Sequence, residues 1–161
     1  MDAEVDTLAP LVFTVEVRCA PDAAFRYFAA ETGAWWPLGT HSVGRGAAVG
    51  CAFEPRAGGR LVERTRDGAA HVWGTVTTWD PPRHLAFTWH PGRSAETAQT
   101  VDVRFTPFDG GTRVTLTHAG WAALGARASA MRDEYGRGWT TVLGERFVRH
   151  VAGADASARR S

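Results

Sequence analysis

The spacing of apolar residues changes once along this chain, near Trp121, and that change restricts the folds open to it. Before Trp121, apolar and polar residues alternate in several short runs, which is typical of strands with one buried face. After it, apolar residues follow the spacing of one amphipathic helix. These residues are Met131, Tyr135, Trp139, Val142, Leu143 and Phe147. A one-faced sheet and a one-striped helix bury their apolar surfaces by packing together.

The alternating runs are separated by Gly-Gly, Asp-Gly and Pro-Pro turns, which favour antiparallel neighbours. We predict a short helix over residues 23–30, after the first strand. The predicted strands cover residues 11–17, 49–53, 60–65, 71–79, 85–89, 101–105 and 113–118. The sequence therefore predicts an α+β domain in which a long C-terminal helix lies across an antiparallel sheet of about six or seven strands.

Length and composition indicate one domain. The chain has 161 residues, of which 44% are hydrophobic, and we assign the domain to residues 10–152. Residues 1–9 and 153–161 are small and polar, so we expect flexible ends. The net charge of +1 without a basic stripe predicts neither nucleic acid nor a membrane surface as partner. No apolar run has the length of a membrane span, and the acidic start lacks a secretory signal, so we expect a cytoplasmic protein.

The residues that usually hold metals or attack substrates do not form a motif. Cys19 and Cys51 are too few for a disulfide framework, and the six histidines lack the spacing of a metal site. Neither a nucleophile signature nor a phosphate-binding glycine loop is visible. We therefore predict no metal and no cofactor, and any reaction would rely on positioning and proton transfer.

Several short motifs follow one another in a specific order. They are residues 35–37 (WWP), 53–63 (FEPRAGGRLVE), 73–76 (WGTV), 81–89 (PPRHLAFTW), 111–118 (GTRVTLTH) and 138–139 (GW). With the strands and helix around them, they make residues 11–152 resemble the START-like superfamily, also called SRPBCC or helix-grip fold. Within it, the chain resembles the domain family named for the activator of heat-shock protein 90 ATPase.

The resemblance implies a sheet curved around the C-terminal helix, with a cavity between them. It also implies binding of a hydrophobic or aromatic small molecule, which is our leading hypothesis. Some relatives are polyketide cyclases or aromatases, so a cofactor-independent cyclase or dehydratase is the alternative. The family name adds a third, a chaperone-associated module in stress response. A homodimer through an edge strand is a further possibility.

Aromatic residues supply most of the candidate ligand wall. Phe53, Phe87, Trp89 and Phe105 share the inward phase of their strands, and Tyr135 and Trp139 belong to the helix stripe. The strand phase leaves the facing of Trp73 and Trp79 open, and Trp73 is kept as a candidate. Trp35, Trp36 and Trp121 lie in Gly- and Pro-flanked segments expected at the cavity mouth. Ordinary core packing is the alternative interpretation for all of them.

Two polar residues occupy inward strand positions. His118 follows Val114 and Leu116 at a period of two, and Glu63 shares a face with Leu61. A buried carboxylate needs a partner, and His118 or an arginine would suit Glu63. The two would serve as polar anchors for a ligand or as a general acid and base. Their alternative role is a structural contact.

Overall fold

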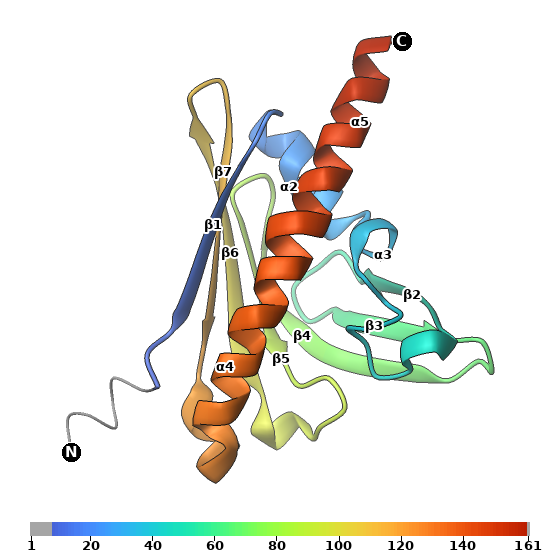
Figure 1. Ribbon diagram of the computed structural model, residues 1–161, viewed down its shortest axis with the longest axis vertical. Coiled ribbons are helices and arrows are strands. Elements are labelled where there is room, and N and C mark those ends of the chain that lie inside the picture. The colour runs from blue at the N-terminus through green and yellow to red at the C-terminus, as the bar shows by residue number, and fades with distance from the viewer. Residues whose placement is uncertain (1–7, 161) are drawn as a thin grey trace.

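The computed structural model describes residues 8–160, without the side chains of residues 155 and 157–160. Seven antiparallel strands form one sheet in the order β1-β7-β6-β5-β4-β3-β2 (Figure 1). Their bounds are β1 Leu11–Val17, β2 Ala48–Phe53, β3 Arg60–Thr65, β4 Ala70–Asp80, β5 His84–Trp89, β6 Gln99–Phe108 and β7 Gly111–Ala119. Two short α-helices, α2 (Pro21–Ala29) and α3 (Thr32–Trp35), follow β1. Single 3-10 turns lie at Arg45–Ala47 and Ala95–Thr97.

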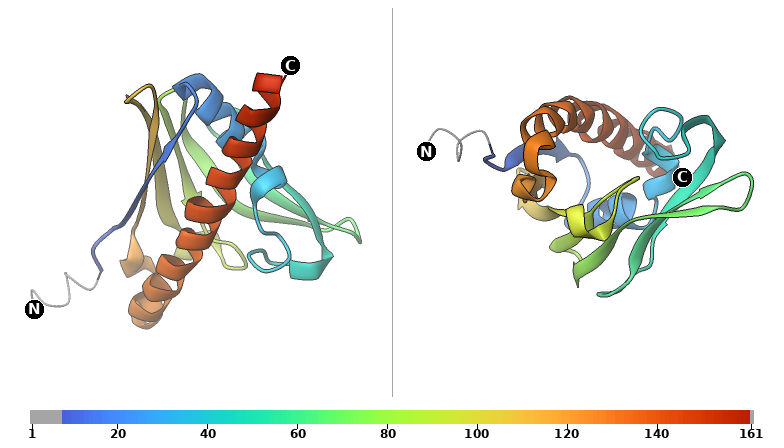
Figure 2. Two further views of the ribbon diagram at one scale, coloured as in Figure 1. Left: turned by 45° about the horizontal axis from the view of Figure 1, so that its top comes forward. Right: turned by 90° about the horizontal axis from the view of Figure 1, so that it is seen from below.

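The chain ends in a long helix with three parts. A 3-10 segment, Trp121–Arg127, leads into α4 (Ala128–Trp139), the π-helical η4 (Thr140–Phe147) and α5 (Val148–Arg160). This helix crosses the concave side of the curved sheet (Figure 2). The α+β helix-grip architecture expected from the sequence is thereby confirmed. None of the helices in the described part is both long and apolar enough to cross a membrane.

The structure describes most of the C-terminal end of the chain and little of the N-terminal end. Residues 153–160, whose composition led us to expect a flexible end, continue helix α5. The expected flexibility of residues 1–9 falls mostly outside the described residues, because the description starts at Leu8.

A bulge resolves the facing of β4 that the sequence left open. In the pairing of β4 with β3, Leu61 lies opposite Gly74 and Val62 opposite Val72, so Trp73 is the extra residue of the bulge and the alternation of side chains changes phase there. Trp73 and Val76 are therefore both buried, each 1% exposed, although they are three residues apart. Trp79 is half-buried and packs edge-on against Phe25, with ring centroids 5.2 Å apart.

Gly74, next to Trp73, lies close to the backbone of β5. A Cβ atom at this position would lie 1.7 Å from the carbonyl oxygen of Thr88. The Thr88 hydroxyl also accepts a hydrogen bond from the backbone N–H of Thr75 at 2.9 Å. Only glycine permits this approach, which helps to set the curvature of the sheet beside the aromatic residues.

Candidate functional site

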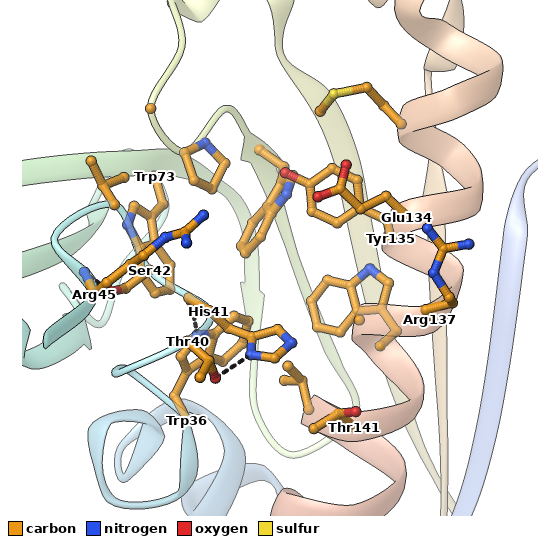
Figure 3. Close-up of a pocket in the computed structure, with 18 residues that line it drawn as sticks. Trp36, Thr40, His41, Ser42, Arg45, Trp73, Glu134, Tyr135, Arg137 and Thr141 are labelled. Carbon is orange, nitrogen blue, oxygen red and sulfur yellow. Dashed lines mark hydrogen bonds between the residues drawn. The ribbon is translucent and has the colours of Figure 1, made fainter.

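A pocket of about 580 Å³ opens between the sheet, the loop before β2 and the C-terminal helix. Figure 3 shows its walls: the loop contributes Trp36, residues 40–43 and Arg45, and the helix contributes residues between Met131 and Val142. Trp73 and Trp89 form the sheet side. The pocket is open to the surface and lies between the sheet and the long helix, with the loop before β2 as its third side.

Five of the twelve candidate ligand-binding residues line this pocket. They are Trp36, Trp73, Trp89, Tyr135 and Trp139. Four of the other candidates are part of the main core, namely Trp35, Phe53, Phe87 and Phe105. Trp121 packs in a smaller cluster with Leu124 and Ala128. Glu63 and His118 are fully buried and lie behind the pocket wall, outside its lining.

The three tryptophans expected at the cavity mouth have different environments, because Trp35 ends α3, Trp36 follows it and Trp121 begins the 3-10 segment. Trp36 lines the pocket, and its indole N–H donates to the carbonyl of His41 at 2.7 Å. Trp35 is 2% exposed, and its indole N–H donates to the carbonyl of Tyr27. Trp121 is 1% exposed and stacks on the His118 ring at 4.2 Å between centroids. The structure therefore brings only Trp36 of the three to the pocket.

Four indoles form a continuous aromatic surface around the pocket. The Trp36 ring lies 5.1 Å from that of Trp73, 5.9 Å from that of Trp89 and 5.7 Å from that of Trp139, measured between centroids. Trp89 and Trp139 are themselves 5.5 Å apart. The rings pack in tilted and edge-to-face arrangements and are between 1% and 7% exposed, so they form a closely packed apolar wall behind the pocket.

Glu63 fixes the loop that forms one wall of the pocket. Its carboxylate accepts hydrogen bonds from the backbone N–H groups of Val43 at 2.8 Å and Gly44 at 2.7 Å. A third comes from the indole N–H of Trp73 at 2.9 Å. The partners are therefore two amides and an indole, in place of the histidine or arginine suggested by the sequence. Burial, together with the charge of Glu63, raises the pKa of the Cys51 thiol to about 12.

His118 is a buried neutral imidazole. Its Nδ1 accepts a hydrogen bond from the indole N–H of Trp139 at 2.9 Å, so the ring proton lies on Nε2. That Nε2 is buried and has no hydrogen-bond partner among the described residues. Burial, with a smaller contribution from the charge of Arg93, lowers the pKa of His118 to about 3. The histidine therefore supports Trp139 from behind the pocket wall.

The polar residues of the pocket were missed by sequence reasoning. Thr40, His41, Ser42 and Arg45 come from the loop, and Glu134, Arg137 and Thr141 from the helix. The Thr40 hydroxyl and His41 Nδ1 are 2.7 Å apart. The loop residues have no periodic pattern to reveal them. The helix residues had a usable signal, because they flank Tyr135 and Trp139 beside the apolar stripe.

Comparisons with known proteins agree with this architecture. The family model for Activator of Hsp90 ATPase homolog 1-like proteins matches residues 16–152. A solved anthrahydroquino-gamma-pyrone synthase, Txn09, is 30% identical, with 88% of this chain and 96% of that chain covered and a TM-score of 0.60. A comparison with curated proteins finds no match.

More distant structures show the same fold. An AHSA1-like protein from Aeromonas hydrophila is 20% identical, with 91% of this chain and 94% of that chain covered and a TM-score of 0.64. A protein from Rhodobacter sphaeroides is 22% identical, with 93% of each chain covered and a TM-score of 0.66. The match over most of the domain, together with the sheet wrapped on the C-terminal helix, places this chain in the Activator of Hsp90 ATPase homolog 1-like family of the START-like superfamily.

Proposed function

We propose that this protein binds a planar, largely apolar small molecule in the pocket between the sheet and the C-terminal helix. One observation carries the proposal: indoles from the loop, the sheet and the helix converge on a single pocket of about 580 Å³. Pockets for small organic ligands are typically of this size and lined by aromatic side chains with a few polar groups. Stacking between tilted indoles suits an aromatic ring system better than a flexible chain.

Indole fluorescence provides the test. A neutral planar probe, 2-(hydroxymethyl)anthracene, is titrated into the protein, and we expect saturable quenching at about one equivalent. Gly138 lines the pocket and a Cβ there would meet only His41, at 3.9 Å, so Gly138→Leu fills the pocket while the backbone is kept. Gly144→Leu is the matched control, because Gly144 is an exposed residue of the same helix.

The expected result is that Gly138→Leu abolishes binding and Gly144→Leu leaves it unchanged. Circular dichroism of both variants establishes that the helix is intact. Equal binding of the probe by both variants would show that it binds elsewhere and would refute the proposed pocket.

A second candidate function is a cofactor-independent ring-forming reaction on an aromatic polyketide. It is favoured by the 30% identity with a gamma-pyrone synthase over nearly the whole of that chain. The titratable groups that line the pocket are His41, Arg45, Glu134, Tyr135 and Arg137. Proton transfer to a bound substrate would accordingly use His41, Glu134 or Tyr135. The acid/base pair considered from sequence, Glu63 and His118, has separate partners and lies outside the lining.

Product analysis by mass spectrometry tests this second function. The wild type is incubated with an aromatic poly-β-ketone, and we expect a product that is lighter than the substrate by one water. This product should be absent when the His41→Phe or Glu134→Gln variant is used in place of the wild type. Glu145→Gln, on an exposed part of the same helix, is the control. Unchanged turnover in both pocket variants would exclude these groups as acid or base.

Interaction with a chaperone has less support in the structure. Among the described residues, the large apolar side chains that are exposed are Val12, Val49 and Phe108. Val12 and Val49 lie on β1 and β2, the two opposite edges of the sheet, and Phe108 is covered by the Arg113 guanidinium at 3.7 Å. A docking surface requires a contiguous apolar patch. Pairing of two copies through β1 or β2 remains a prediction.

A further inference from the structure

The hydrogen-bond donors of the four pocket indoles are not equivalent. The N–H groups of Trp36, Trp73 and Trp139 donate to His41, Glu63 and His118 respectively. The N–H of Trp89 is buried and has no partner among the described residues, although Trp89 lines the pocket. An unpaired buried N–H destabilises a protein, and a ligand oxygen is one way to satisfy it. Trp89 is thus the one indole of the four whose N–H has no partner among the described residues.

The charges of the pocket are also unbalanced. Glu134 and Arg137 lie three residues apart on α4 and both line the pocket, and Arg137 forms no ion pair with any described residue. Arg45 lines the opposite wall and forms no ion pair with any described residue. Figure 3 shows its side chain extending from the loop toward the pocket. With two guanidinium groups and one carboxylate among its lining residues, the pocket has an excess of positive charge, and Arg45 lies on the wall opposite Glu134.

The backbone holds Arg45 in this place. Arg45 has a φ of 48°, a left-handed conformation that is unfavourable for a residue with a side chain. The two preceding amides are fixed by the Glu63 carboxylate, and the Arg45 N–H donates to the Ser42 hydroxyl at 2.8 Å. Strained residues kept in place by buried contacts are frequent at binding sites. The buried carboxylate is thus used in positioning the cation.

We infer that the pocket selects planar aromatic anions, whose carboxylate or phenolate faces Arg45 and whose second acceptor, a ring carbonyl, accepts the Trp89 N–H. This inference rests on the proposed function and specifies its ligand class. An uncharged aromatic hydrocarbon would satisfy the stacking surfaces and leave both polar groups without a partner. A cationic aromatic would meet Arg45 with a like charge.

Charge selection is tested with two probes of equal shape, anthracene-2-carboxylate and anthracene-2-carboxamide. We expect the wild type to bind the carboxylate about fivefold more tightly, the ratio typical of one partly exposed ion pair. Arg45→Gln is expected to bring this ratio close to one. Arg146→Gln is the matched control, because Arg146 is exposed on the C-terminal helix and lies outside the pocket lining, so the preference should remain.

Carbonyl recognition is tested with anthraquinone-2-carboxylate against anthracene-2-carboxylate. We expect Trp89→Phe to weaken binding of the quinone about fivefold more than that of the anthracene. Trp36→Phe is the control, since the Trp36 N–H is already bonded to His41 and its loss should affect both probes equally. In the wild type, the Trp89 indole N–H resonance should shift on binding the quinone and stay in place with the anthracene. The resonance keeps the test available if Trp89→Phe does not fold.

The outcomes separate this inference from the proposed function. If the carboxamide binds as tightly as the carboxylate, or Arg45→Gln leaves the ratio unchanged, selection of anions is wrong while aromatic binding stands. If Trp89→Phe leaves the ratio of quinone to anthracene affinity unchanged, and the Trp89 indole N–H resonance of the wild type does not shift, the proposed carbonyl contact is wrong. If no probe binds, charged or neutral, the proposed function itself fails.

Discussion

We expect acid to destabilise this fold through His118. The imidazole is 0% exposed, and burial with the charge of Arg93 lowers its pKa from 6.5 to about 3. The unfolded chain takes up the proton near pH 6.5, whereas the folded protein excludes it until about pH 3. In this window the unfolded state binds more protons, so the free energy of unfolding falls as the pH falls. From pH 7 to pH 5 the loss is about 2 kcal/mol.

Urea unfolding, followed by tryptophan fluorescence at pH 7, 6 and 5, measures this loss. His118→Asn is the reference, because its amide oxygen can still accept the Trp139 N–H and it does not titrate. All other groups titrate alike in both proteins, so the wild type should lose about 2 kcal/mol more than the variant. If the variant does not fold, ¹⁵N shifts of the wild type should show Nε2–H and an unprotonated Nδ1 down to pH 5. A pH-independent difference, or a protonated ring at pH 5, would refute a buried neutral histidine.

Three further predictions concern stability and reactivity. Glu63→Gln should lower the free energy of unfolding by about 3 kcal/mol, measured in urea, because the new amide N–H₂ faces groups that are themselves donors. Gly74→Ala should lower the free energy of unfolding by at least about 3 kcal/mol, since its Cβ would meet a backbone oxygen. Gly144→Ala on the exposed helix face should be neutral or raise the free energy of unfolding by up to about 1 kcal/mol. Equal melting temperatures of the two variants would contradict this prediction. Iodoacetamide labelling with peptide mass spectrometry should leave Cys51 unmodified at pH 8 until urea unfolds the protein, because its pKa of about 12 keeps it a thiol.

The fold was predictable because it follows from the alternation of apolar and polar residues in the strands and from the spacing of apolar residues in the helix. Every predicted strand is present, and Trp139, Val142, Leu143 and Phe147 are buried as the helix stripe required. The same phase argument placed Glu63 and His118 inside the protein, and both are 0% exposed. Side-chain direction on a regular element is a local property, so a single sequence suffices to derive it.

The site was only partly predictable because it depends on irregular backbone. The bulge of β4 opposite β3 turns Trp73 inward, and no residue type in that strand indicates it. The partners of Glu63 are amides of the loop before β2, and their position depends on the path of that loop through space. Arg45, which lines the pocket, has a left-handed backbone conformation that a sequence pattern does not indicate for arginine.

The π-helical segment explains how one straight helix can serve both the pocket and the core. Along the whole C-terminal helix, apolar side chains repeat at intervals of four residues, at Met131, Tyr135, Trp139, Leu143, Phe147 and Val151. In a regular α-helix, residues four apart rotate by about 40° per step, and five such steps would turn the stripe by about 200°, away from the sheet. The wider turns of η4 (Thr140–Phe147) underwind the helix and counteract this rotation. A strict four-residue repeat is therefore the sequence sign of underwinding, and it keeps Tyr135 beside the pocket while Val151, five turns on, still faces the core.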